Sequence, residues 1–470
     1  HTDILMRLGQ AGQAFLVTER WRARALVEAI AAPAHSLTRE QRQREDALLA
    51  AIGAIQRELL SGSLTASAKT AVRTRLTAAE ADLDLFRVGL RRAPVTAEPP
   101  PVLDDAEVRR QLLGPREAAI VFALGEERSY AWLLTPSQLH SAVLPAKKHV
   151  AAAVQAYRAL LTRPVNALTA TSALRGLDTE GAKLHQMLIA PFVPHLQNVD
   201  ALTIVPDGVL AYLPFDALPG GRRMIERFRI RYAPSLSAIA VLRERNKTRQ
   251  APSKALLAFA DPAYPTAKDA SPTLAAYRER GVPDTRLPGS RTEVLAIRAL
   301  HGTSNSRVYF GDDAHEPALK QEALEQYRYL HLAAHGYLDE QQPARSGILL
   351  LPGPGSDDGI VQVEDILRLR LNADLVTLSA CQTGIGEVVD GEGVMGLSRA
   401  FLQAGAQGVV VSLWNVNDSA SAELMQAFHQ NLKAGLGRDE SLRRAKLTLL
   451  RKPGPWRHPY FWAAFVGMGD

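Results

Sequence analysis

The strongest constraint on the fold lies in the second half of the chain, where short apolar segments alternate with helical patterns. These segments are ALLAFAD, SRVYF, YRYLHLAA, GILLL, ADLVTLSA and GVVVSLW, all between residues 255 and 414. Helical patterns lie between several of them. Alternating strands and helices favour a parallel sheet whose two faces are both covered. The sequence therefore predicts an α/β fold for this part of the chain.

A first α/β region precedes this one. From about residue 103 the residue pattern changes from helical to mixed α/β, and AAIVFALGEERSYAWLLT is predicted to form a hairpin of two strands. Leu202 to Val205 is a buried strand, and helical patterns such as Ala151 to Leu161 lie between. No nucleophile and base are paired in this half. The second α/β half begins near residue 252, after the charged helix end ERNKTRQ.

Residues 1 to about 95 are predicted to be helical. AFLVTERWRARALVEAI carries apolar residues at helical spacing, and a helix from about Thr38 to Leu60 follows a break at Pro33. A third helix comes after Ser61 to Ser63, so the last two form an αα-hairpin. A Pro-rich linker spans residues 94 to 102. We therefore divide the chain into a helical region (1–100), a first α/β half (101–250) and a second α/β half (251–470).

Composition narrows the classes of function. No run of ~18 apolar residues could span a membrane, and HTDILMRLGQ lacks the pattern of a signal peptide, so we expect a cytoplasmic protein. The single cysteine cannot form an internal disulfide, and the histidines show no metal-ligand spacing. We therefore expect no metal and no other cofactor. The net charge of +6 comes mostly from scattered Arg, which predicts a solvated surface and no nucleic-acid partner.

His335 and Gly336 follow the strand predicted from Tyr329 to Ala334. A lone histidine near an apolar segment is more often a core or surface residue than a catalytic one. However, sites in open parallel sheets lie outside the carboxyl ends of strands, and His335 has this position. We therefore interpret His335 as a candidate general base. Gly336 lets the backbone approach a ligand closely, and we expect its N–H to be exposed.

Cys381 lies just past a second buried strand, Leu375 to Ser379. A single free cysteine is usually an inert small hydrophobe. This one is followed by Gln382, Thr383 and two nearby glycines, and such a turn exposes a sulfur and frees backbone N–H groups.

The interval between His335 and Cys381 is 46 positions (381 − 335), long enough to bring the two strand ends side by side. A nearby imidazole favours ionisation of a thiol. No acidic partner for His335 is evident, so we predict a Cys–His dyad whose imidazole a backbone carbonyl could orient.

Asn415 and Asp418 follow a third strand, Val409 to Leu413, and are expected to emerge beside Cys381. The alternative for Asp418 is a role as N-cap of the helix predicted in ASAELMQAFHQNL. The Gly-rich loops 352–359 and 384–393 flank the predicted site, and we expect them to be mobile.

Four motifs resemble the CHAT family in the family's order: LHLAAHG, VTLSACQTG, GEGVMGLSRAFLQAGAQGVVVSLW and HPYFWAAFVG. CHAT domains are caspase-like, are often attached to tetratricopeptide repeats, and are distantly similar to separase. The resemblance covers about residues 100 to 470. It implies a double caspase-like fold with an inactive first half and an active second half. It also implies His335 and Cys381 as the dyad, with the amides of Gly336 and Cys381 as an oxyanion hole.

The resemblance further implies a cysteine endopeptidase that cleaves a protein partner, in bacterial settings such as defence or programmed cell death. SLWNVND resembles the stretch in which CHAT domains and separase bind an arginine before the scissile bond, which implies Asp418 and Asn415 as S1 residues. Asn415 stands where separase tends to have a second Asp. A regulatory protein or signal is expected to act through the N-terminal helices, which would pack on the α/β region. Two alternatives are a catalytically silent CHAT signalling module and a Cys–His acyl-transfer enzyme for a small molecule.

Overall fold

The computed structural model of the chain describes residues 1–31, 38–60, 65–91, 102–264, 285–339, 343–353, 357–379, 381–383, 392–414 and 418–470. The helix breaks expected at Pro33 and at Ser61 to Ser63 lie outside these ranges, as does almost all of the linker expected at 94–102.

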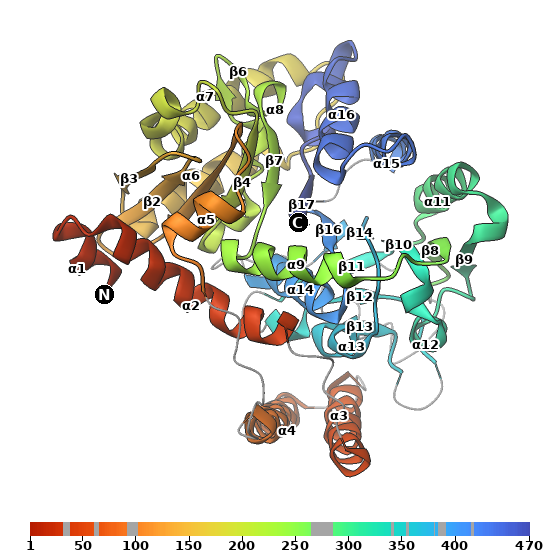
Figure 1. The fold of residues 1–470 in the computed structure, drawn as a ribbon. Helices are drawn as coiled ribbons and strands as arrows, with labels where there is room; N and C mark the ends of the chain where they lie inside the picture. Colours follow the sequence, from red (N-terminus) through yellow and green to blue (C-terminus); the bar gives the residue numbers. More distant parts are fainter. Residues whose placement is uncertain are drawn as a thin grey trace.

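The core of the molecule is one 11-stranded, mostly parallel sheet that runs through both α/β regions (Figure 1). In order across the sheet, the strands are β3 (Leu139–Leu144), β2 (Ser129–Leu134), β1 (Glu117–Ala123), β4 (Ala201–Val205), β7 (Arg229–Tyr232), β17 (Phe465–Gly469), β16 (Gly408–Ser412), β14 (Leu375–Leu378), β10 (Tyr327–Ala333), β8 (Lys254–Pro262) and β9 (Ser306–Gly311). Strands β4, β14 and β16 are buried along their whole length because the sheet has covered faces. The predicted α/β fold class with a parallel sheet is confirmed.

The predicted hairpin is also present, as the antiparallel pair β1 and β2. The sequence analysis missed β3, which pairs antiparallel with β2 at the edge of the sheet. Its residues, LHSAVL, are only partly buried, so the segment lacks the continuous apolar run that marks the central strands.

A second, four-stranded sheet carries the segments next to the predicted site. Its order is β13 (Ile360–Gln362), β12 (Gly347–Leu349), β11 (His335–Tyr337) and β15 (Cys381–Thr383). The segment GILLL was expected among the alternating strands of the parallel sheet, and this placement is wrong. It forms β12, which is antiparallel to both β11 and β13. Leu349 and Ile360 pack with Tyr264 in an apolar cluster of their own, so these short strands need no place in the main sheet.

Strand β17 joins the two α/β regions. It is antiparallel to β16, from the Gly408–Gly469 pair to the Ser412–Phe465 pair, and parallel to β7 through Met468 and Tyr232. One hydrophobic core extends through both regions. The two regions are therefore halves of a single sheet.

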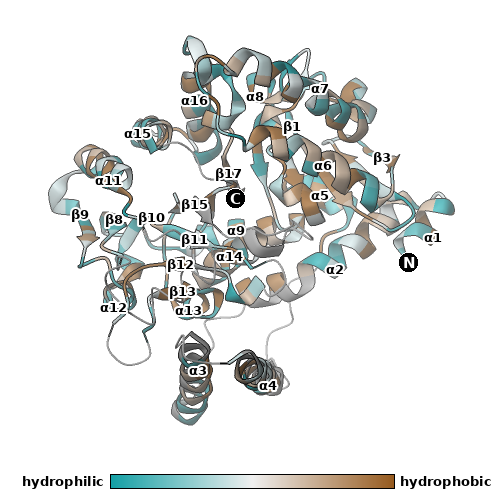
Figure 2. Cartoon of the chain, turned by 180° about the vertical axis from the view of Figure 1, so that it is seen from behind, coloured by the Kyte–Doolittle hydropathy of each residue, from teal (hydrophilic) through white to brown (hydrophobic). Residues whose placement is uncertain are grey.

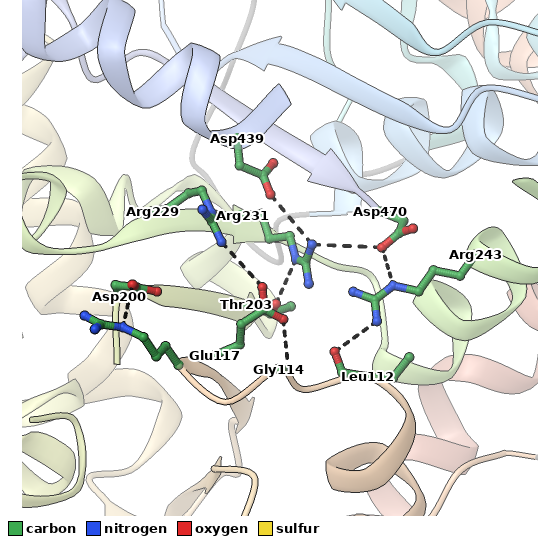
Figure 3. A network of polar contacts seen from close by, with 11 residues as sticks. Leu112, Gly114, Glu117, Asp200, Thr203, Arg229, Arg231, Arg243, Asp439 and Asp470 are labelled. Carbon is green, nitrogen blue, oxygen red and sulfur yellow. Dashed lines mark hydrogen bonds and ion pairs between the residues drawn. The ribbon is translucent and has the colours of Figure 1, made fainter. Parts of the chain in front are cut away.

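Polar contacts reinforce this junction (Figure 3). Arg231 of β7 donates to Thr203 Oγ1 at 2.9 Å and lies 3.7 Å from Asp439 and 3.9 Å from Asp470. Arg243 Nε donates to Asp470 Oδ1 at 2.6 Å. Cationic side chains of the first half thus bind carboxylates that belong to the end of the second.

Buried charged side chains make further contacts between the halves. Arg158, in α6 (Lys147–Leu161), donates to the carbonyl oxygens of Tyr212 at 2.8 Å and Leu413 at 3.3 Å. Lys446, in α16 (Arg438–Leu450), pairs with Asp216 of the first half, and both side chains are buried. Because each contact satisfies a charge that is removed from water, the halves depend on one another.

The N-terminal helices divide into two groups. Helices α1 (Thr2–Arg7) and α2 (Ala11–Ala31) lie on the body, where α2 contacts α9 (Leu236–Thr248) and α14 (Glu392–Ala404). Helices α3 (Arg39–Leu60) and α4 (Ala66–Arg91) form the predicted αα-hairpin. This hairpin packs around its own cluster of Ile52, Leu76 and Leu83 and projects from one side of the body (Figures 1 and 2). The expectation that the N-terminal region packs on the α/β body is correct for α1 and α2, whereas the hairpin contacts the body through the ion pair of Glu45 with Arg368.

The remaining helices are α5 (Asp105–Gln111), α7 (Ala170–Leu188), α8 (Met224–Arg227), α11 (Pro288–His301), α12 (Glu316–Gln321), α13 (Val363–Arg368) and α15 (Asp418–Lys433), and β5 (Pro219–Gly220) pairs with β6 (Arg222–Arg223). Within the described ranges, no helix combines the length and the hydrophobicity that crossing a membrane would require.

Candidate active site

His335 lies two residues past the carboxyl end of β10, an interior strand of the main sheet. It is 2% exposed. Its backbone N–H donates to the Tyr264 hydroxyl at 3.0 Å, and the two rings lie 5.0 Å apart between centroids. The Tyr264 hydroxyl in turn donates to the Leu349 carbonyl at 2.7 Å. Tyr264 therefore connects His335 to the neighbouring strand β12.

The imidazole of His335 is oriented by a backbone carbonyl. Its Nε2 lies 2.9 Å from the carbonyl oxygen of Thr285. A carbonyl oxygen can only accept, so Nε2 carries the hydrogen and Nδ1 keeps its lone pair in the neutral ring. Nδ1 is buried and has no hydrogen-bond partner among the described residues. This is the kind of orienting group that the sequence analysis expected for a dyad.

Burial lowers the pKa of His335 below its ordinary value because the charged imidazolium is disfavoured away from water. The hydrogen bond to the Thr285 carbonyl and the negative charge of Asp418 act in the opposite direction. The net direction is downward, so the imidazole is neutral near pH 7. A neutral ring with an open Nδ1 is able to accept a proton.

Cys381 is the register partner of His335. Strand β15 runs parallel to β11, and the paired positions are His335 with Cys381 and Gly336 with Gln382. Neighbouring strands lie about 4.8 Å apart, so the backbones of His335 and Cys381 are adjacent. The two strand ends thus lie side by side, as the interval between them led us to expect.

The expectation that the Gly336 N–H is exposed is wrong. Gly336 is buried in β11 and has strand partners on both sides, Ile348 in β12 and Gln382 in β15. The reason is that the chain continues as a strand after His335 and β12 folds back beside it.

Asp418 is exposed and is close enough for its charge to act on His335, whereas Asn415 lies outside the described residues. Asp418 is the first described residue of α15, and because 415–417 lie outside the described residues, the alternative role of Asp418 as an N-cap stays a prediction. Its side chain covers Gly289: a Cβ at position 289 would lie 2.5 Å from the Asp418 Cβ and 2.8 Å from Oδ2. Gly289 therefore leaves the room that the Asp418 side chain fills.

Three residues around the site were not predicted: Tyr264 and Thr285, which contact His335, and Asp261, which holds the segment that follows Thr285. Asp261 ends the strand predicted as ALLAFAD, and its carboxylate pairs with Arg286 and Arg291. Thr285 contributes only a backbone carbonyl, and because every residue has one, its role cannot be predicted from the sequence. Asp261 had a weak signal, since a carboxylate that closes a buried strand stands at the edge where sites form.

The loops expected to be mobile are described only in part, because 354–356 and 384–391 lie outside the described residues. The described ends of the first loop are held by polar contacts, one buried and one exposed. Gly359 N–H donates to Glu316 at 2.8 Å, and Lys320 lies 3.1 Å from Asp357. The mobility of both loops stays a prediction.

A family model and two relatives match parts of the chain. The model of the CHAT domain matches residues 178–470. Tetratricopeptide repeat protein 28 of Mus musculus is 39% identical over 111 residues, which are 24% of this chain and 4% of that protein. The Homo sapiens protein of that name is 26% identical over 334 residues, 61% of this chain and 13% of that protein. The chain thus spans only a small part of these relatives.

Among solved structures, the separase–securin complex of Saccharomyces cerevisiae matches with a TM-score of 0.46 and 11% identity, over 77% of this chain and 30% of that chain. The Arg-specific cysteine proteinase gingipain R (RgpB of Porphyromonas gingivalis) matches with a TM-score of 0.37 and 10% identity, over 69% of this chain and 75% of that chain. These likenesses concern the fold alone.

Proposed function

The chain belongs to the CHAT domain family, and from this we propose that it is a cysteine endopeptidase that cleaves a protein partner. Cys381 is the nucleophile and His335 is the general base. The observation that carries the proposal is the register pair of His335 with Cys381, together with the Thr285 carbonyl that leaves Nδ1 of the imidazole open.

In this mechanism Nδ1 of His335 takes the thiol proton of Cys381. The thiolate attacks the carbonyl carbon of the scissile peptide bond, and the C–N bond then breaks to leave a thioester on Cys381. The leaving amine takes its proton from the imidazolium. Water, deprotonated by the same imidazole, hydrolyses the thioester and restores the thiol.

The resemblance implies the amides of Gly336 and Cys381 as donors to the oxyanion. Support for the Cys381 amide comes from its position beside His335, whereas Gly336 lies between β12 and β15 and would have to turn its N–H toward the substrate. Fixed N–H groups stabilise the charge that develops on the carbonyl oxygen in the transition state.

Asp418, with Asn415, is the proposed S1 carboxylate, which gives a preference for a basic residue before the scissile bond. Support comes from the position of Asp418, which packs against Gly289 in the segment that follows Thr285 and whose charge acts to raise the pKa of His335. A carboxylate binds a guanidinium well, often through two hydrogen bonds.

We also propose that a partner or signal controls the site through the N-terminal helices. Helix α2 contacts α14, which follows Cys381 in the chain. A displacement of α2 would therefore reach the segment that holds the nucleophile.

The test compares cleavage of a peptide library, and labelling by a cysteine-directed activity probe, in the intact chain and in three variants. Cys381→Ala should abolish both. His335→Ala should lower cleavage by at least about 10²-fold, the usual scale for a lost general base. The exposed His149→Ala serves as the matched control and should leave cleavage unchanged.

Full activity in Cys381→Ala or His335→Ala would exclude the dyad. An intact chain that neither labels nor cleaves, even with activator present, would favour the silent signalling module. Turnover of small acyl donors without peptide cleavage would favour the acyl-transfer enzyme.

A further inference from the structure

The end of strand β8 is distorted next to the candidate site. β8 pairs with β10 up to the Ala260–Ala333 pair, and its register with β9 shifts between Ala260 and Pro262. Asp261, at the shift, has a φ of 48° and is the one non-glycine residue with positive φ in the described part of the chain. Bulges of this kind re-aim a side chain at a strand end, and positive φ is tolerated by Asp better than by most residues.

The re-aimed carboxylate of Asp261 is 3% exposed and holds one short segment at several points. It accepts from Arg286 at 2.8 Å (Nε) and 2.5 Å (Nη2), and from Arg291 Nε at 3.0 Å. It also accepts from the backbone N–H of Leu287 at 3.2 Å. Two-pronged contacts between a guanidinium and a carboxylate fix geometry as well as charge.

The segment that Asp261 holds begins directly after Thr285, whose carbonyl accepts from His335 Nε2 at 2.9 Å. The same segment contains Ser290, whose hydroxyl accepts from the Asp261 backbone N–H at 2.9 Å. The two contacts support each other: the Asp261 carboxylate holds the segment through Arg286 and Leu287, and Ser290 of that segment binds the backbone of Asp261 in the bulge. The position of the Thr285 carbonyl depends on both.

We propose that Asp261 is a positioning residue for the general base. By clamping Arg286 and Leu287, it holds the Thr285 carbonyl against the imidazole, so that His335 keeps its hydrogen on Nε2 and presents Nδ1 to Cys381. The proposal rests on the proposed function, in which His335 is the base. The Asp261 side chain would contact neither the substrate nor the imidazole, but it would determine the tautomer of the His335 ring.

If Asp261 only stabilised the fold, its replacement would change the stability of the protein alone. If it positions His335, its replacement also changes the pH at which the Cys381 thiol ionises. Cys381 is the single cysteine of the chain, so alkylation by iodoacetamide reports on that thiol without interference. The alkylation rate follows the thiolate fraction. The Nε2–H···O=C bond to Thr285 stabilises the imidazolium that remains after the thiol has lost its proton.

The experiment measures the pH profile of Cys381 alkylation, together with kcat and KM for a cleaved peptide, in the full chain and in Asp261→Asn. Asn has nearly the same shape and also tolerates positive φ. We expect the thiol to ionise about one pH unit higher, because the imidazolium loses its held acceptor. We expect kcat to fall by up to about 10²-fold, the cost of a misplacement near 1 Å, with KM nearly unchanged. Arg286→Gln, at a half-exposed side chain, should act in the same direction even if Asp261→Asn folds poorly.

Asp313→Asn is the charge-matched control at an exposed position and should alter neither readout. If His335→Ala moves the alkylation profile but Asp261→Asn and Arg286→Gln do not, the positioning role is overturned while the dyad stands. If His335→Ala leaves the profile where it is, the dyad itself fails. A loss of thermal stability in Asp261→Asn with an unchanged profile and kcat also overturns the proposal.

Discussion

At the scale of single residues, the surroundings of His335 are built largely from backbone groups. The Thr285 carbonyl receives Nε2–H, and the backbone N–H of His335 is bound by the Tyr264 hydroxyl. No carboxylate contacts the ring directly among the described residues. The charge of Asp418 acts on the imidazole through space and opposes the effect of burial on its pKa. Asp418 can therefore be removed without breaking a hydrogen bond to His335.

Asp418 provides a residue-scale prediction about specificity. In a peptide series that varies the residue before the scissile bond, Asp418→Asn should weaken the preference for Arg by up to about fivefold, because an ion pair with an exposed carboxylate contributes about 0–1 kcal/mol. Gly289→Ala should act in the same direction, because its Cβ would lie 2.5 Å from the Asp418 Cβ and force that side chain away. Ser419→Ala, at the next exposed position, is the control. A wild type that prefers Asp or a small apolar residue would contradict the S1 assignment.

Cys381 and His335 could be predicted from the sequence, whereas Thr285 and Tyr264 could not, for physical reasons. Cys381 and His335 stand at the ends of buried strands, where side-chain identity and position together suggest chemistry. Thr285 acts through a carbonyl that every residue possesses. Tyr264 reaches His335 across 71 positions, so the contact depends on the tertiary fold alone.

At the scale of elements, α11, α15 and β10 meet in a buried group of histidines. His301 Nε2 lies 3.0 Å from His429 Nδ1, and His331 Nε2 lies 2.6 Å from Glu293 Oε1. The rings of His331 and His429 lie 5.7 Å apart between centroids. Because α15 begins with Asp418 and β10 leads to His335, this group holds together the elements that frame the candidate site.

The histidine group predicts acid sensitivity. Burial lowers the pKa of His301 to about 4, with the charges of Lys433 and Arg328 in the same direction, and it lowers the pKa of His429 well below the ordinary value. Below about pH 6.5 the unfolded chain therefore binds protons that the folded chain does not. The free energy of unfolding should therefore fall as the pH is lowered from about 6.5 to about 4. Denaturant titrations at several pH values measure this loss.

A His301→Gln variant keeps a hydrogen-bonding side chain but cannot take up the proton, so it should flatten part of the acid slope. His149→Gln, at an exposed position, should not. Equal slopes in all three proteins would place the acid sensitivity elsewhere.

The elements that sequence reasoning found are those with long apolar runs. β10, β14 and β16 were predicted because their buried lengths leave few alternatives. β11 and β15 were missed because three residues are too few to show a period. These two strands set the register between His335 and Cys381, so the sequence located the site but could not specify its pairing.

At the scale of the whole molecule, the N-terminal helices are attached in two different ways. The α2 side chain of Phe15 is fully buried in the main core, and Glu19 accepts from the Ser237 N–H at 2.6 Å. The α3–α4 hairpin has a cluster of its own, and Arg368 of the body lies 3.5 Å from Glu45 of the hairpin. Among the described residues the hairpin shares no hydrophobic cluster with the body, so we expect it to add little to the stability of the body.

Replacing residues 38–91 by a flexible linker should therefore leave the melting temperature of the body within a few degrees of the original. Basal labelling of Cys381 should also persist. Removing residues 1–31 should instead lower the melting temperature strongly, because it exposes the surface that Phe15 covers. Calorimetry and probe labelling on both deletions check this. A body that unfolds without the hairpin would show that α3 and α4 belong to the core.

The position of β17 has a consequence for how a new chain matures. A ribosome produces β7 and β16 before it produces the strand that lies between them in the finished sheet. Until Phe465–Gly469 has emerged, both neighbours keep an open edge, and the carboxylate of Asp470 cannot yet meet Arg243. The nascent protein can make contacts such as that of Arg158 with Leu413 earlier, but the sheet becomes continuous through both halves only after β17 has been translated.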